Sequence, residues 1–367
     1  MISYGHTSCI ACHVSVQGRG LLKGYGRGID MEQSLSDLDF TAQALGKIID
    51  AKYATGDWDG QFGHVLSDLV LTGRINQEFD RDKTDPTFSA LFRQVIFVGA
   101  KQHFRVNYEV GLRDTELHDT KLGPHLTATG GRNVFLKKLM LEWRIKGKGA
   151  SGGSELAIGR DYLPIGLQLD DYSTYSLHLN RDGIYDFPLQ LKYFVWKENW
   201  LASAFVFAPT FEEAETRREY GAGFLFERYP ITRLVLGAQA LMGFADESNR
   251  LRIGPYVRWG ISPKWTLLAE VDYTHFWDAG IGKLQGDQVT AFLQLYYHHT
   301  EWLVSSLTGN YANSQLLTSG EDHFSGRYTL SARLNRNLTI GVTYTRGDIR
   351  RNLSSGEEGS VFANLKF

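Results

Sequence analysis

The chain lacks any run of 18 consecutive apolar residues, so its 367 residues include no candidate for a transmembrane helix. Proline is scarce, with 8 residues against 39 glycines, and this balance suits turns and strands better than helices. Neither sign of charge is in excess, because the formal net charge is −2. A near-neutral chain gives no support for a nucleic-acid partner.

The absence of an apolar helix does not exclude a membrane. Strands of a membrane barrel face lipid with every second residue, so their average hydropathy stays low, and the mean hydropathy here is −0.26. Tyr, Phe and Trp together make up 13% of the residues. This share suits the aromatic girdles of a membrane β-barrel.

Both cysteines of the chain fall in one motif, Cys9-Ile10-Ala11-Cys12-His13. This C-x-x-C-H pattern is the attachment signature of a c-type haem. The two thiols add to the haem vinyl groups, and the adjoining imidazole is placed to take one axial position on the iron. We therefore expect one covalent haem, held by Cys9, Cys12 and His13.

Other interpretations of the motif fit less well. A structural zinc site needs four Cys or His ligands at regular spacings, and the chain has no second C-x-x-C. A redox dithiol belongs beside a βαβ pattern, which the sequence does not show. A disulfide across two intervening residues would cross-link almost nothing.

Residues 1–63 differ in composition from the rest, and we expect them to form the haem-binding unit. Glycines crowd the stretch after the motif, from Gly18 to Gly28, and let the backbone wrap a flat macrocycle. Residues 32–51 fit a helix that begins near Ser34 or Ser36, with an extended plug segment as the alternative.

From residue 64 to the end, apolar and polar residues alternate with a period of two. In 103–113, for example, Phe104, Val106 and Tyr108 share one face, and Arg105 and Asn107 share the other. The predicted strands are 64–79, 90–99, 103–113, 134–145, 154–161, 187–196, 199–208, 218–229, 232–243, 250–260, 264–275, 288–299, 302–312, 324–335, 337–346 and 358–367.

Short and long connections alternate between these strands, as in outer-membrane barrels. The last strand ends in Phe367, which resembles the terminal signal that the bacterial barrel-assembly machinery recognises. We predict an all-β membrane protein: a sixteen-stranded antiparallel transmembrane barrel over 64–367, with the cytochrome segment 1–63 plugging its lumen.

The face opposite the apolar one carries charges, which we expect to line the lumen: Arg74, Glu78, Arg105, Glu109, Glu142, Arg144, Arg160, Arg252, Arg258, Glu270, Asp272, Arg327 and Arg333. A mixed-charge ladder that fills a polar lumen is the simpler interpretation. Arginines that bind haem propionates are the alternative.

Residues 4–15, followed by Gly20-Leu21-Leu22 and Tyr25-Gly26-Arg27, resemble the fused cytochrome–porins, best known from the outer-membrane iron oxidases of iron-oxidising bacteria. The resemblance implies one N-terminal haem and a sixteen-stranded barrel. Residues 4–8 depart from the iron-oxidase pattern, which leaves the electron donor open.

The sequence leaves several candidates for the second axial ligand of the haem iron. Met31 lies eighteen residues beyond His13, and a thioether ligand raises the haem potential. His6 lies three residues before Cys9. His64, His103 and an open or water-bound position are further alternatives.

The expected function is electron transfer across the outer membrane of a Gram-negative bacterium, between an extracellular donor or acceptor and a periplasmic electron-carrier cytochrome. Oxidation of extracellular Fe²⁺ is its specific version. The alternatives are a passive diffusion porin with a haem-bearing plug and a scaffold barrel around a separate cytochrome. Export needs an N-terminal signal peptide, and residues 1–4 do not look like the start of one. We therefore expect Met1 to be the first residue of a mature or trimmed chain.

Overall fold

The computed structural model describes residues 56–60, 63–79, 83–98, 103–113, 133–149, 152–167, 188–209, 219–245, 248–278, 286–314, 322–335, 337–348 and 355–366. Strands and turns make up these parts of the chain, with no α-helix among them. Accordingly, no helix of the described residues is long and apolar enough to cross a bilayer. The expected helix over 32–51 lies outside the described residues.

Sixteen antiparallel strands form the barrel. They are β2 (Gly63–Glu78), β3 (Lys83–Val98), β4 (Phe104–Arg113), β5 (Asn133–Gly149), β6 (Gly152–Arg160), β7 (Leu189–Lys197), β8 (Trp200–Ala208), β9 (Glu219–Ile231), β10 (Leu234–Ala245), β11 (Ser248–Gly260), β12 (Trp265–Asp278), β13 (Gly286–His298), β14 (Leu303–Ser314), β15 (Asp322–Arg333), β16 (Leu338–Asp348) and β17 (Ser355–Lys366).

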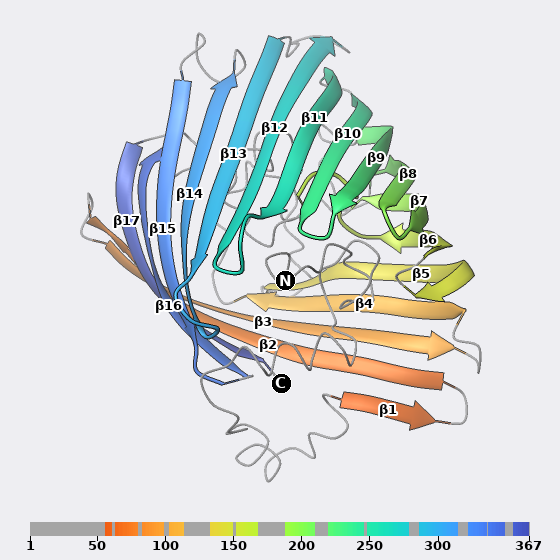
Figure 1. Ribbon diagram of the computed structural model, residues 1–367, viewed down its shortest axis with the longest axis horizontal. Helices are drawn as coiled ribbons and strands as arrows, with labels where there is room; N and C mark the ends of the chain where they lie inside the picture. Colours follow the sequence, from red (N-terminus) through yellow and green to blue (C-terminus); the bar gives the residue numbers. More distant parts are fainter. Residues whose placement is uncertain are drawn as a thin grey trace.

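Each strand pairs with the next along the chain, and the last closes the ring on the first. The closing pair runs from Glu358 opposite Glu78 to Lys366 opposite Val70. Figure 1 shows the sheet curving from β17 through β12 to β6, and returning as β5 to β2. The closed ring leaves no long free strand edge. A membrane-spanning sheet requires this closure, because backbone groups cannot stay unpaired in hydrocarbon.

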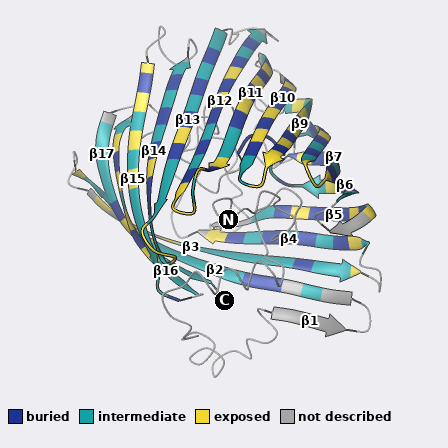
Figure 2. Cartoon of the chain, viewed as in Figure 1, coloured by how far each residue is buried: buried dark blue, intermediate teal, exposed yellow. Residues whose placement is uncertain are grey.

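The two faces of the wall differ as the period of two predicts. Along β10 the side chains alternate, with Leu236, Met242 and Phe244 exposed outward and Val235 and Leu241 buried inward. Figure 2 shows this alternation as bands along β9 to β13. The outward face is therefore an apolar band suited to hydrocarbon.

Paired aromatic side chains mark both ends of this band. Near the short turns, Trp265 lies 4.5 Å from Tyr297, centroid to centroid, and Phe104 stacks on Trp143. Near the long loops, Tyr311 lies 4.9 Å from Phe324. Aromatic girdles of this kind sit at the two membrane–water interfaces of barrel proteins.

Connections at one end are short, and most of those at the other are long. The strand β7 ends at Lys197 and β8 begins at Trp200, whereas β6 ends at Arg160 and β7 begins only at Leu189. We refer to the short-turn end and the long-loop end below. The predicted alternation of connections is confirmed except at two places of the long-loop end, since only four residues separate β2 from β3 and two separate β10 from β11. Both described termini of the barrel, Gly63 and Lys366, lie at the short-turn end.

One short strand, β1 (Gly56–Gly60), lies outside the ring of sixteen. It pairs with the start of β2, from Gly56 opposite Ser67 to Gly60 opposite Gly63. On the same edge of β2, the last pair of β17 is Lys366 opposite Val70. The strand β1 therefore continues the ladder of β17 toward the short-turn end, although the sequence predicted no strand before residue 64.

Two details of the predicted barrel are wrong. The strand β3 begins at Lys83 rather than at residue 90, and Pro86 pairs in register with Ile75 instead of lying in a loop. Arg160 pairs in register with Leu189, which belongs to the exposed outward face, so Arg160 is one residue out of phase with the lumen. Gly159, just before it, has a φ of 142° that departs from regular strand geometry.

Topology gives a direct prediction for epitope tags. A tag inserted between Ser354 and Ser355, in the connection from β16 to β17 at the long-loop end, is expected to bind antibody on intact cells. A tag between Ser262 and Pro263, in the turn from β11 to β12, is expected to bind only after the outer membrane is opened. The opposite labelling would invert the orientation of the barrel.

Candidate functional site

The lumenal side of β4 to β7 carries a network of buried ion pairs. Arg105 Nη2 lies 2.7 Å from Glu155 Oε2, and Arg144 Nη2 lies 2.8 Å from the same oxygen. Arg105 also pairs with Glu142 on β5. Glu155 is only 2% exposed, and the two arginines are also buried. Its carboxylate therefore compensates the positive charges of two guanidinium groups that have little contact with water.

Asp161, which follows the last residue of β6, extends this network. Its Oδ2 atom lies 2.7 Å from Lys192 Nζ and 3.2 Å from Lys138 Nζ. Burial alone would raise the pKa of Asp161, but the attraction of Lys138 and Lys192 outweighs it and lowers the pKa to about 2. Asp161 therefore stays ionised and fixes the start of the connection to β7.

A second network lies on β9 to β12. Arg252 Nη2 lies 2.7 Å from Asp272 Oδ2 and 3.2 Å from Glu270 Oε1. Gln239 Nε2 donates hydrogen bonds to both carboxylates, at 2.8 Å to Glu270 and 2.6 Å to Asp272. Nearer the long-loop end, Arg250 pairs with Glu219 at 2.7 Å. The arginines on this wall are thus held by carboxylates of neighbouring strands.

These contacts confirm the mixed-charge interpretation for Arg105, Arg144 and Arg252, and also for Arg258, which lies 2.6 Å from Glu227. Sequence reasoning missed several partners: Lys138, Glu155, Asp161, Lys192, Glu219, Glu227, Gln239 and Arg250. A signal was available for two of them, because Lys192 and Gln239 alternate along their strands with apolar neighbours. Asp161 lies just beyond a strand, where alternation carries no information.

The connection that leaves β6 folds into the barrel. The N–H of Leu167 donates a 3.0 Å hydrogen bond to Glu270 Oε2 on β12, six strands further along the sheet. Ile165 packs on the inward rings of Phe205 and Phe207 of β8. Residues 161–167, the infolded segment, therefore lie inside the barrel against β8 to β12 and are anchored on a strand far from the one that they leave.

Gly166 makes this anchoring possible. Its φ of 65° lies in the left-handed region, which side chains with a Cβ disfavour. A Cβ atom at this position would also lie 2.4 Å from Glu270 Oε1. The backbone can approach the Glu270 carboxylate this closely only without a side chain.

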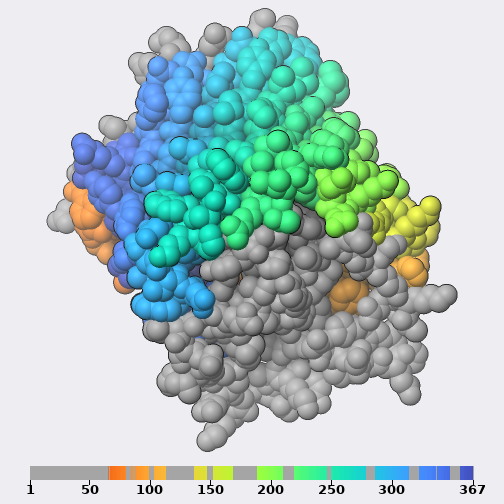
Figure 3. Space-filling view, viewed as in Figure 1, coloured from red at the N-terminus to blue at the C-terminus, as the bar shows by residue number. Residues whose placement is uncertain are grey.

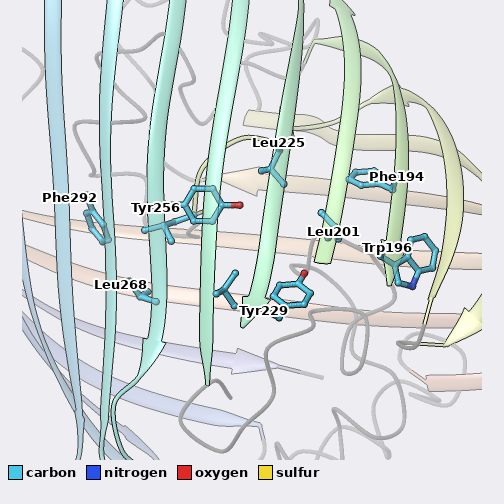
Figure 4. Packing of buried hydrophobic residues seen from close by; sticks show 10 residues of the cluster. Phe194, Trp196, Leu201, Leu225, Tyr229, Tyr256, Leu268 and Phe292 are labelled. Atoms are coloured by element: carbon cyan, nitrogen blue, oxygen red, sulfur yellow. The ribbon is translucent and has the colours of Figure 1, made fainter. Parts of the chain in front are cut away.

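Apolar side chains cover the short-turn half of the same wall. We call this set the lumenal apolar cluster: Leu167, Phe194, Trp196, Leu201, Leu225, Tyr229, Val235, Tyr256, Leu268 and Phe292. Figure 4 shows them extending from adjacent strands toward one side of the sheet. Among the described residues, Leu167 is the one member that comes from outside the wall.

Two features give the cluster a flat surface with a polar border. The ring of Tyr256 lies over Gly237 of β10, where a Cβ would meet the ring at 2.1 Å. The hydroxyls of Tyr229 and Tyr256 donate to Glu227, at 2.8 Å and 2.7 Å. Glu227 also binds Arg258, so these two charges at the border are paired with each other.

No family model matches the chain, and no curated protein matches it either. Several solved structures do match the chain. The barrel is similar to outer-membrane porins. The outer membrane channel DcaP of Acinetobacter baumannii superposes with a TM-score of 0.60 at 13% identity, over 85% of this chain and 100% of that chain.

Two more porins give the same result. For OmpF of Salmonella typhi, solved in complex with daunomycin, the TM-score is 0.62 at 11% identity, over 85% of this chain and 100% of that chain. For OprB of Pseudomonas putida, the TM-score is 0.58 at 7% identity, over 83% of this chain and 94% of that chain. The porin fold agrees with the predicted location in the outer membrane of a Gram-negative bacterium.

The predicted haem residues lie outside the described part of the chain. Cys9, Cys12 and His13, with the candidate ligands Met31 and His6, therefore remain predictions. His103, another candidate, is half-buried, and its Nδ1 atom lies 3.0 Å from the carbonyl oxygen of Arg144. Within the described residues, no group of three or more His, Cys, Asp or Glu side chains is placed to hold a metal ion.

Proposed function

We propose that the protein is an outer-membrane channel whose lumen is narrowed from within. The observation that supports this function best is the infolded segment inside a closed sixteen-stranded barrel. Inside the barrel the N–H of Leu167 binds Glu270, and paired charges line the wall on both sides of that contact. Figure 3 shows the outer surface of β9 to β15 as one continuous wall.

The chemistry of the lumen favours small polar solutes. Threonine, serine and asparagine face inward on β13 to β16, for example Thr290, Thr308 and Asn310, and they offer hydrogen bonds without net charge. The opposite wall carries both signs of charge, each neutralised by a close partner. Away from the lumenal apolar cluster, a solute therefore meets polar groups and paired charges of both signs.

Substitution of Gly166 tests this function. Purified protein in a planar bilayer is expected to conduct ions, and Gly166→Ala is expected to raise the mean conductance and add switching between levels. A left-handed alanine costs about 1–2 kcal/mol, which shifts the anchoring of the infolded segment by about tenfold. Gly309→Ala is the matched control, because a Cβ there meets nothing within 4 Å. Identical traces for both variants, or no conductance at all, would contradict the proposal.

A second candidate function is electron transfer through the same barrel, and the motif Cys9-x-x-Cys12-His13 favours it. Two thiols and one imidazole at this spacing are the donor set that a c-type haem needs. Bound there, the haem supplies a one-electron couple. Cys9 and Cys12 would hold it covalently, and His13, with Met31 or His6, would supply ligands to its iron.

The barrel suits this second function because a hydrocarbon core of about 30 Å insulates donor from acceptor. A redox group outside the barrel would leave that layer unbridged. Inside it, the wall excludes lipid and the lumen excludes large molecules. The proposed partners are a periplasmic cytochrome and an extracellular donor or acceptor, with Fe²⁺ as one candidate donor.

A further inference from the structure

We propose that the segment 32–51 packs inside the barrel on the lumenal apolar cluster, with the stripe Leu35, Leu38, Ala42, Leu45 and Ile49 as its contact face. The inference relies on the proposed function only in treating the N-terminal segment as lying within the barrel. It does not rely on haem. It assigns to the cluster an occupant from this chain.

The cluster is out of place in a water-filled lumen. Many other described inward positions carry charges or neutral polar groups, although Phe205, Phe207 and Leu241 form a smaller apolar group. Here Phe194, Trp196 and Phe292 are each 2% exposed. Burial of a large apolar side chain stabilises a fold by about 1.5–3 kcal/mol, so an apolar patch of this size favours an apolar partner. Leu167 covers one edge of it and is a single side chain.

The position of β1 directs the chain that precedes it toward the interior. Gly56 pairs with Ser67, about 13 Å along β2 from its first residue at 3.3 Å per residue. The ladder cannot continue, because Lys366 of β17 already pairs with Val70. Unpaired backbone is not tolerated in hydrocarbon, so the chain reaches Gly56 from the water-accessible side of the wall.

The cluster lies at the same end of the barrel as Gly56. Trp196 is the second-last residue of β7, next to the turn into β8. Leu201 and Val235 are the second residues of β8 and β10. All three therefore lie beside short turns. A chain that enters the barrel at the level of Ser67 is therefore at the same end of the lumen as the cluster.

The sequence immediately before β1 offers a matching surface. Leu35, Leu38, Ala42, Leu45 and Ile49 recur at intervals of three and four residues, which places them along one face of a helix. Ser36, Gln43 and Lys47 fall on the opposite face. An apolar stripe of this kind needs a partner, and the neutral cluster supplies one without burying an unpaired charge.

Photo-cross-linking of the full chain tests the inference. With p-benzoylphenylalanine in place of Phe292, which faces the lumen, we expect a cross-link to a peptide within residues 32–51. The same substitution at Leu293, the adjacent outward residue, is the control and should give none. Cross-links only to residues 168–187, or none at all from barrels that keep their heat-dependent gel mobility, would overturn the inference.

A second measurement covers the case in which the bulky label disturbs the cluster. Leu38→Lys with Leu45→Lys is expected to make proteolytic removal of the N-terminal segment at least about tenfold faster, since two buried leucines are lost. Ser36→Lys with Gln43→Lys should leave the rate unchanged. Equal rates for both pairs would contradict the inference.

The outcome is separable from the proposed functions. Cross-links from Phe292 in Cys9→Ala/Cys12→Ala protein would keep the inference although no haem is attached. A conducting or electron-transferring barrel without these cross-links would keep the function and reject the inference.

Discussion

Replacement of Cys9 and Cys12 by alanine is expected to abolish covalent haem and, with it, electron transfer through the barrel. Both thioether bonds require these thiols, and the chain has no other cysteine to replace them. Wild-type protein should retain haem peroxidase staining on a denaturing gel. Vesicles that contain the protein and an enclosed oxidised cytochrome should reduce it when a reductant too large for the lumen is added outside.

The double alanine variant should show no stain, and its rate of reduction should fall to that of vesicles without protein. Met31→Ala is the matched control, because it leaves the attachment motif intact and keeps the stain. If Met31 is the second axial ligand, this control also lowers the haem potential. Equal reduction rates for wild type and the double variant would reject electron transfer, and the channel function would then stand alone.

Replacement of Glu155 by leucine is expected to destabilise the barrel severely. Glu155 accepts hydrogen bonds from Arg105 at 2.7 Å and 2.8 Å and from Arg144 at 2.8 Å. Removal of one partner from a buried ion pair costs about 3–5 kcal/mol, and here two cations lose a carboxylate that they share. Urea unfolding in detergent micelles, followed by the loss of the folded gel mobility, measures the effect.

Glu198→Leu is the control for this loss. Glu198 is exposed in the turn between β7 and β8, so its replacement should leave the unfolding midpoint nearly unchanged. A Glu155→Leu variant as stable as the control would mean that water or another acid compensates the two arginines. The mixed-charge network would then contribute little to the stability of the wall.

The sixteen strands were predictable because each meets two different solvents. Lipid on one side and the lumen on the other impose a period of two over about ten residues, as in β11, where Leu251 and Ile253 alternate with Arg252. The start of β3 was missed because Pro86 cannot donate to a ladder and usually marks a strand boundary. Pro86 is tolerated in β3 because it lies near the end of this long strand.

The lumenal apolar cluster was missed because the lumen of a barrel was expected to be polar throughout. A signal exists in β8, where Leu201 of the cluster and the neighbouring inward Phe205 and Phe207 alternate with Ala204 and Val206, so that both faces are apolar. Such a continuous apolar run is typical of a strand covered on both sides. The infolded segment had no signal of this kind, since Leu167 reaches Glu270 through its backbone N–H.

The short strand β1 was unpredictable for a different reason. Gly56, Asp57, Asp59 and Gly60 have poor strand propensity, so nothing local favours an extended conformation. The ladder forms because the first residues of β2 extend beyond the end of β17 and would otherwise leave N–H and C=O groups unpaired. A long-range requirement thus decides the structure of five residues.

This arrangement also has a consequence for self-association. An unpaired strand edge is a template on which another copy of the same strand can add. The start of β2 is such an edge, and β1 pairs with its first five residues, Gly63 to Ser67. The strand β1 therefore covers the exposed edge where β2 meets β17. A shortened chain that begins after Gly60 would leave this edge of β2 unpaired, and two barrels could associate through it.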